Sequence, residues 1–166
     1  GIPYRIYGGM SFYQRKEIKD VIAYFRVVAN HDDEEALKRI INYPTRGIGD
    51  TTVAKIAAVA TARGVSLWDV VCNPVRLGLD VSKATVNKLA TFRQMIVGWT
   101  ERMVTEDAYQ LGHGIIMESG ISKDIYSSRN PEDLSRQENL EEFLNGMQDF
   151  VESRREEDMA EEIYLP

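Results

Sequence analysis

Apolar residues recur along most of this chain at steps of three and four, which is the spacing of one face of an α-helix. In the segment 15–30, polar residues separate the apolar positions Ile18, Val21, Ile22, Phe25, Val28 and Ala29. The clearest case begins at Ser82 and has its apolar positions at Leu89, Phe92, Ile96, Trp99 and Met103. Both patterns predict amphipathic helices that bury one face in a core.

Capping residues mark the ends of the helices between these two segments. Asp33 is expected to cap a helix that runs to about Asn42 and ends before Pro44. Asp50 is a candidate N-cap for the next helix, and Gly64 is expected to end it. These residues predict two helices joined by a short connection.

The remaining periodic segments are also helical. Ser66, with Asp69 three residues later, resembles a capping box at the start of a short helix. Further helices are predicted near residues 106–118 and 131–154. The fold class expected from these patterns is mainly α, a compact helical domain.

The first residues follow a different pattern. The run from Tyr4 to Tyr7 is β-branched and aromatic and ends at Gly8, which predicts a strand followed by a turn and the helix of residues 15–30. A lone strand leaves its backbone hydrogen-bonding groups without partners. We therefore expect residues 1–31 to pack on elements that this chain does not supply, and the chain from Asp32 onwards to fold by itself.

Composition limits the kind of protein. The chain has 166 residues, of which 43% are hydrophobic and 28% charged, values typical of one globular domain. No apolar run approaches the roughly 18 residues of a membrane span, so we expect a cytoplasmic protein with no membrane contact. Cys72 is the single cysteine, and His31 and His113 lie far apart in sequence. We expect no metal site.

Charge is unevenly distributed along the chain. The net charge of -6 argues weakly against nucleic-acid binding, and the segment 132–162 is strongly acidic. Between Ala36 and Gly64, however, the only acidic residue is Asp50, against the bases Lys38, Arg39, Arg46, Lys55 and Arg63. A local basic surface is therefore compatible with the acidic total.

The stretch TRGIGDTTVAKI, residues 45–56, joins two of the expected helices. Gly47 and Gly49 can both adopt positive φ, and Ile48 between them is expected to plug into the core. The backbone amides would then point outward beside the positive end of the following helix, which suits a phosphate. The candidate ligands are Arg46, Gly47, Ile48, Gly49, Thr51, Thr52 and Lys55.

This arrangement is typical of a helix-hairpin-helix, which holds the DNA backbone without recognising bases. The alternative is a turn that joins two helices and binds nothing.

Several segments together resemble the UvrD/PcrA/Rep family of superfamily 1 DNA helicases. They are IPYRIYGGMSFYQRKEIKDVIAYFRVVAN, RIINYPTRGIGDTTVAKI, SLWDV and SRQENLEEF. The resemblance implies that residues 1–31 are the edge of the second RecA-like motor domain, 2A. It implies that residues 32–166 are the inserted helical domain 2B, incompletely present. In that family the Gly-Ile-Gly hairpin touches duplex DNA ahead of the fork.

The resemblance also extends to two further groups of residues. The segment containing Phe12, Arg15 and Glu17 lies beside the single-strand track of the motor in this family, so Arg15 is expected to orient that region or contact a strand phosphate. The alternative is a structural ion network of Arg15, Glu17 and Asp20. The family's R-x-E-N-L segment falls on a late helix, where packing and hydrogen bonding are the expected roles of Arg136, Glu138 and Asn139.

The resemblance implies that the parent protein is an ATP-dependent 3′-to-5′ DNA helicase that uses ATP and magnesium. This chain has no G-x-x-x-x-G-K-[ST] loop, so we expect no ATP hydrolysis, no catalytic residue and no cofactor in this part. The expected partners are duplex DNA and the remaining motor domains. Two alternatives stay open: a protein-interaction or autoregulatory helical module, and part of a helicase–nuclease subunit of the RecB or AddA kind.

Overall fold

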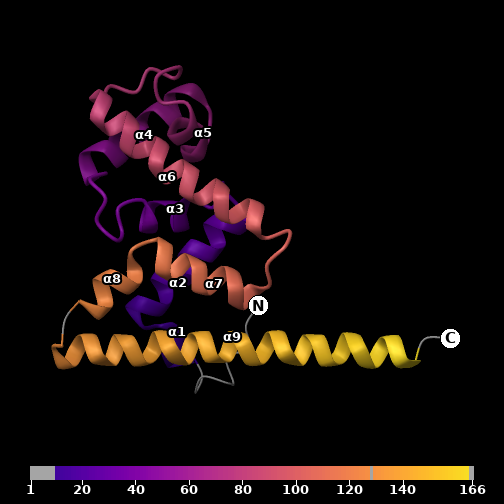
Figure 1. Ribbon diagram of the computed structural model, residues 1–166. Coiled ribbons are helices and arrows are strands. Elements are labelled where there is room, and N and C mark those ends of the chain that lie inside the picture. The colour runs from indigo at the N-terminus through magenta and orange to yellow at the C-terminus, as the bar shows by residue number, and fades with distance from the viewer. Residues whose placement is uncertain (1–9, 128, 165–166) are drawn as a thin grey trace. The chain divides into compact units, whose positions relative to one another are not determined.

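The computed structural model describes residues 10–127 and 129–164, and every regular element in that part of the chain is an α-helix (Figure 1). The mainly α fold class is therefore confirmed. The expected strand from Tyr4 to Tyr7 and the glycine turn after it lie outside the described residues. The helices are α1 Met10–Tyr13, α2 Lys16–Ala29, α3 Glu34–Ile40, α4 Asp50–Arg63, α5 Leu67–Cys72, α6 Lys83–Arg102, α7 Ala108–Glu118, α8 Ile121–Tyr126 and α9 Pro131–Tyr164.

The chain divides into two compact units. Residues 20–101 form one, here called the hairpin unit, and residues 1–19 with 102–166 form the other, here called the long-helix unit. Neither limit coincides with the expected division between residues 31 and 32. Assignment of these segments to two domains of a parent protein stays a prediction.

The core of the hairpin unit is built from the apolar faces of its helices. α5 packs on α3 and α4, and Glu34 Oε2 accepts a hydrogen bond from the Leu67 amide at 2.9 Å. On α6 the predicted apolar stripe is buried at Leu89, Phe92, Ile96 and Trp99. Met103 does not continue it, because α6 ends at Arg102 and this side chain is 46% exposed.

Three predicted caps are present. Asp33 accepts a hydrogen bond from the Ala36 amide at the start of α3. Ser66 and Asp69 form the reciprocal capping box of α5. Gly64 ends α4 in the left-handed conformation at φ 66°, where glycine carries no steric penalty. The sequence was sufficient to predict these helix ends, because each one depends on residues only three or four positions apart.

The apolar face of α2 finds partners inside the chain, contrary to the sequence expectation. Tyr24 is fully buried and packs edge-on against Trp99, with ring centroids 5.8 Å apart. Thr100 Oγ1 donates to the Val28 carbonyl at 3.2 Å, and Asp20 pairs with Arg39 at 2.7 Å. α2 therefore supplies part of the core of this unit, and independent folding of the chain from Asp32 onwards stays a prediction.

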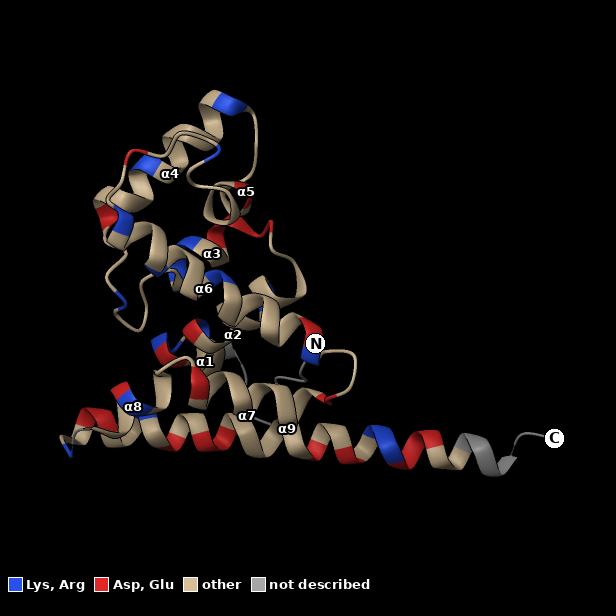
Figure 2. Ribbon diagram, turned by 45° about the horizontal axis from the view of Figure 1, so that its top comes forward, with Lys and Arg blue, Asp and Glu red and all other residues tan. Residues whose placement is uncertain are grey.

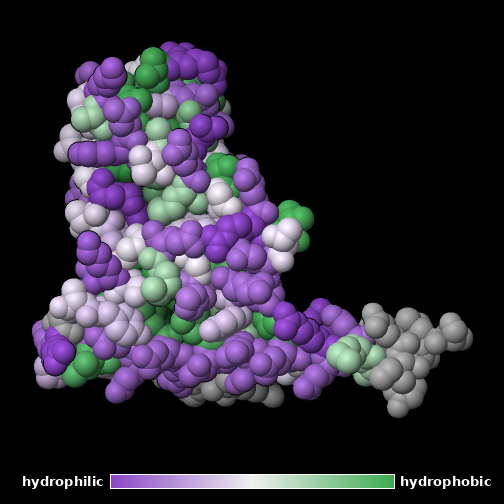
Figure 3. Space-filling model, in the orientation of Figure 1, coloured by the Kyte–Doolittle hydropathy of each residue, from purple (hydrophilic) through white to green (hydrophobic). Residues whose placement is uncertain are grey.

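The long-helix unit is dominated by α9, which packs on α7 and α8. Its buried apolar residues recur at steps of three and four, and the side of α9 that faces the viewer in Figure 3 is mostly hydrophilic. α8 was not predicted, and α9 extends well beyond the predicted end near residue 154. The buried apolar residues that join these helices are Ile115, Ile121, Ile125, Leu140, Phe143 and Met147.

Within the described residues, no helix combines the length and the apolar character that crossing a membrane requires.

Candidate nucleic-acid interface

The Gly-Ile-Gly turn lies between α3 and α4 in the hairpin unit. Gly47 has φ 81°, a conformation that favours glycine, whereas Gly49 has φ −77° and ψ 178°, which any residue can adopt. Ile48 is 0% exposed, so its predicted place in the core is confirmed. The prediction of positive φ is correct for Gly47 and wrong for Gly49, because the chain is already extended as it enters α4.

Asn42 closes the turn from inside. Its Oδ1 accepts hydrogen bonds from the Arg46 amide at 2.9 Å and from the Ile48 amide at 3.1 Å. These two amides therefore do not point outward, as the glycine pattern suggested. The side chain of Asn42 instead replaces the backbone partners that the turn lacks, which fixes its conformation.

Arg46 is directed into the protein rather than towards solvent. Its guanidinium donates to the carbonyls of Ile40 and Ile41, and Nη2 donates to the Tyr24 hydroxyl at 2.5 Å. Its carbon Cζ lies 5.1 Å from the centre of the Phe92 ring. Arg46 thus joins the end of α3, α2 and α6 at the turn, a structural role that its sequence position did not reveal.

The Tyr24 hydroxyl completes this cluster. It donates to the Tyr43 carbonyl while it accepts from Arg46. Burial raises the pKa of Tyr24, although the charge of Arg46 and its hydrogen bond oppose the shift. The hydroxyl therefore keeps the proton that the Tyr43 carbonyl needs.

Among the described residues, no side chain caps the N-terminus of α4. Gly49 is the N-cap, and its carbonyl accepts from the Val53 amide at 3.1 Å. Asp50 was the predicted cap, but it is the first helical residue. Its backbone has already entered the helix, and only the residue before it keeps the extended conformation of an N-cap. Thr51 is exposed and Thr52 is half-buried at this uncapped end.

Lys55 lies one turn further along α4 and is exposed. Its Nζ donates to the Asp80 carbonyl at 2.9 Å, just before α6. It forms no ion pair among the described residues. Its charge is therefore not held in an ion pair in the described part of the chain, although the carbonyl that it contacts belongs to an acidic residue, Asp80.

Lys88 is a neighbour of the turn that the sequence did not identify. A Cβ atom added to Gly47 would lie 2.8 Å from Lys88 Nζ, so the ammonium group rests directly against the glycine. Figure 2 shows lysine or arginine on α3, α4 and α6 of this unit. Helical periodicity places Lys88 on the polar face of α6, but only the tertiary structure shows that this face meets Gly47.

The second group of candidates lies in the long-helix unit. Phe12 is 4% exposed and Glu17 is 7% exposed, and Asn139 Nδ2 donates to Glu17 Oε1 at 2.6 Å. Arg15 is exposed, so it is the one member of this group that is open to a ligand. The hydrogen-bonding role expected for Asn139 is confirmed.

Arg136 and Glu138 belong to the same R-x-E-N-L segment as Asn139 but have different surroundings. Arg136 bonds Asp133 at 3.3 Å and Glu132 at 3.5 Å on its own helix, and Glu138 is exposed. Asp20 pairs with Arg39 at 2.7 Å, and the alternative network of Arg15, Glu17 and Asp20 stays a prediction.

No group of three or more histidine, cysteine, aspartate or glutamate side chains in the described part of the chain is placed to hold a metal ion.

Comparison with known proteins adds a family and several relatives. The family model described as the UvrD-like helicase C-terminal domain matches residues 1–164. The ATP-dependent DNA helicase PcrA of Bacillus subtilis is 35% identical over 160 residues, which are 96% of this chain and 21% of that protein. DNA helicase II of Escherichia coli is 31% identical over 158 residues, 95% of this chain and 22% of that protein. The chain thus spans about a fifth of the length of these relatives.

Proposed function

The chain belongs to the family of UvrD-like helicase C-terminal domains, and we propose that it serves an ATP-dependent 3′-to-5′ DNA helicase by holding the backbone of duplex DNA near the fork. Its relatives are named as DNA helicases, and it covers about a fifth of their length. ATP and magnesium would then bind other parts of the parent protein. The assignment of residues 1–31 to motor domain 2A and of 32–166 to inserted domain 2B belongs to the same proposal.

The observation that carries the proposal is the uncapped start of α4 beside Gly47. The first amides of a helix have no intrahelical acceptor, and here no side chain among the described residues supplies one. A phosphate oxygen is a suitable acceptor, because the positive end of the helix dipole adds to the hydrogen bonds. The hydroxyl of Thr51 lies at the same end and is exposed.

Charge around this end favours a phosphate over a neutral ligand. Lys55 and Lys88 flank the turn, and neither forms an ion pair among the described residues. Asp50 opposes this charge, since its exposed carboxylate lies in the first turn of α4, and Asp80 beside Lys55 is also acidic. Phosphates carry no sequence information, so binding through these groups would be independent of base sequence.

The test measures binding of a fluorescent duplex of mixed sequence by anisotropy over a range of salt concentrations. Two to four phosphate contacts predict a log–log salt slope of roughly -2 to -4. The double variant Thr51→Ala with Lys55→Ala should bind more weakly and flatten the slope by about one unit, because one cationic contact is lost. Asp50→Asn, which removes the opposing charge at nearly constant size, should strengthen binding.

A matched control lies at the other end of the same helix. Thr61→Ala with Arg63→Ala removes one hydroxyl and one cation from exposed positions that are remote from the turn. This control should keep the salt slope of the unaltered chain. If both double variants keep that slope while remaining folded, the turn only joins two helices and the interaction-module alternative is favoured.

A further inference from the structure

A hollow of about 240 Å³ lies beside the Gly-Ile-Gly turn, on the face of α6. We propose that this hollow binds a second phosphodiester of the DNA backbone, next to the one at the start of α4. This inference rests on the proposed function. The backbone of one strand would then pass over Gly47 and contact both helices. The residues that line the hollow are Arg46, Asn87, Lys88, Thr91, Phe92 and Met95.

Arg46 gives the hollow a positive charge that is not paired with a carboxylate in the described part of the chain. Its hydrogen bonds use three of the five N–H groups of a guanidinium, and all three acceptors are uncharged oxygens. No acidic residue among those described forms an ion pair with it. A half-buried guanidinium with unused donors is a suitable partner for a phosphate oxygen, since charge-assisted hydrogen bonds to phosphate are strong.

Lys88 connects this hollow to the start of α4. Its Nζ, Cε and Cδ would lie 2.8, 3.0 and 3.1 Å from a Cβ atom at residue 47, so the side chain occupies the space that glycine leaves free. The ammonium group therefore lies at the rim of the hollow and against the turn at the same time. A single lysine in this position can neutralise a phosphate on either side.

The remaining walls suit the rest of a nucleotide unit. Thr91 and Asn87 are exposed polar residues one turn apart on α6, and Thr91 Oγ1 donates to the Asn87 carbonyl at 3.1 Å. The Asn87 amide group can donate to a phosphate oxygen. Met95, which is half-buried, provides apolar surface for the carbons of a sugar.

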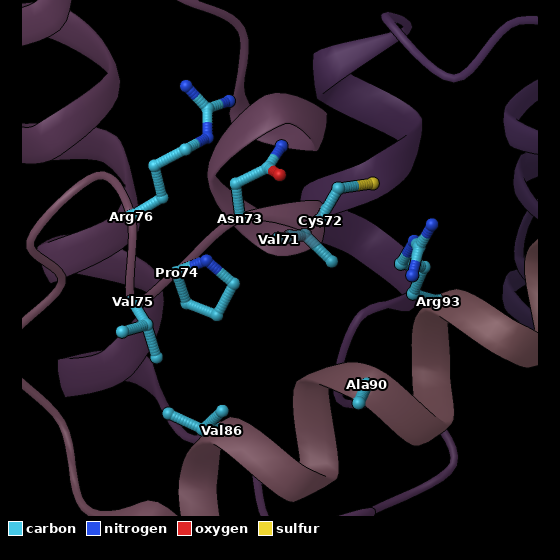
Figure 4. Close-up of a pocket in the computed structure, with 9 residues that line it drawn as sticks. All are labelled: Val71, Cys72, Asn73, Pro74, Val75, Arg76, Val86, Ala90 and Arg93. Carbon is cyan, nitrogen blue, oxygen red and sulfur yellow. The ribbon is translucent and has the colours of Figure 1, made fainter.

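A hollow of similar size between α5 and α6, about 260 Å³, lacks this chemistry (Figure 4). Figure 4 shows Arg76 pointing away from it and Arg93 lying towards Cys72. Valine, alanine and proline side chains make up most of its other walls. Phosphate binding is therefore assigned to the hollow beside the turn and not to every cavity with a nearby arginine.

The experiment compares two exposed lysines of α6 that differ in position. Lys88→Gln removes the charge at the hollow, and Lys83→Gln removes a charge from the first residue of the helix. With the anisotropy assay, Lys88→Gln should weaken duplex binding about two- to fivefold and flatten the salt slope by about one unit. Lys83→Gln should leave the slope unchanged.

A second measurement uses the unaltered chain and so does not depend on the folding of a variant. Lysine acetylation is quantified by mass spectrometry with and without saturating duplex. DNA should protect Lys88 but not Lys83.

The outcomes separate the two proposals. If the unaltered chain shows no salt-dependent duplex binding, both the proposed function and this inference are overturned. If Thr51→Ala with Lys55→Ala flattens the slope while Lys88→Gln behaves like Lys83→Gln and Lys88 is not protected, only the second phosphate site is overturned. Protection of Lys88 together with a flatter slope in Lys88→Gln supports it.

Discussion

Substitution of the two glycines of the turn by alanine should have unequal effects on stability. Gly47 has φ 81°, where an L-residue carries a penalty of about 1–2 kcal/mol, whereas Gly49 has φ −77° and carries none. A Cβ atom at residue 47 would also meet Lys88 Nζ at 2.8 Å, but this contact is with the flexible end of a side chain that can move. A Cβ atom at residue 49 meets nothing within 4 Å.

The unfolded state also contributes to the stability difference between each variant and the unaltered chain. Replacement of glycine by alanine reduces the entropy of the unfolded state, which stabilises the folded protein by about 0.4–1 kcal/mol. For Gly47→Ala the net loss in the free energy of unfolding is therefore about 1 kcal/mol, which lowers the melting temperature of a chain of this size by about 2–4 °C. For Gly49→Ala the same entropy gain opposes the weaker N-cap propensity of alanine, so stability should change little.

Urea and thermal unfolding followed by circular dichroism measure both variants against the unaltered chain. Equal stability of Gly47→Ala and the unaltered chain would refute the assigned left-handed conformation. A loss in Gly49→Ala as large as that in Gly47→Ala would show instead that the effect does not arise from φ.

Two further predictions concern the interior of the hairpin unit. Asn42→Ala should lower the free energy of unfolding, measured in urea, by about 2 kcal/mol, because the Arg46 and Ile48 amides lose their acceptor. Asn42→Asp keeps an acceptor oxygen and should recover most of this stability. Equal losses in the two variants would contradict the role of Oδ1. Burial lowers the pKa of His31, although Asp32 opposes the shift, so the unfolded chain takes up the proton first and stability should fall as pH drops from about 6.5 through the lowered pKa. His31→Gln should flatten this decline in thermal unfolding, while replacement of the exposed His113 by Gln should leave it in place.

Much of the helical framework follows from the sequence, because its determinants are local. The apolar stripe of α6, the Asp33 cap and the Ser66 capping box each depend on residues within one or two turns. The burial of Ile48 was also predicted from the glycine pattern, although only Gly47 adopts the positive φ that the pattern suggested. Errors arose where two local solutions compete, as at Asp50, which is as suitable a cap as Gly49 by residue type.

How the turn is held, and which charges surround it, depends on contacts that form in the folded chain. Periodicity shows which face of a helix is buried but not which element it packs against, so nothing in the sequence places Lys88 against Gly47. In the same way, Arg46 is part of a basic segment, yet its guanidinium is turned inward by carbonyls and the Tyr24 hydroxyl. These contacts join residues far apart in the chain, and their energies depend on the distance and burial that folding alone creates.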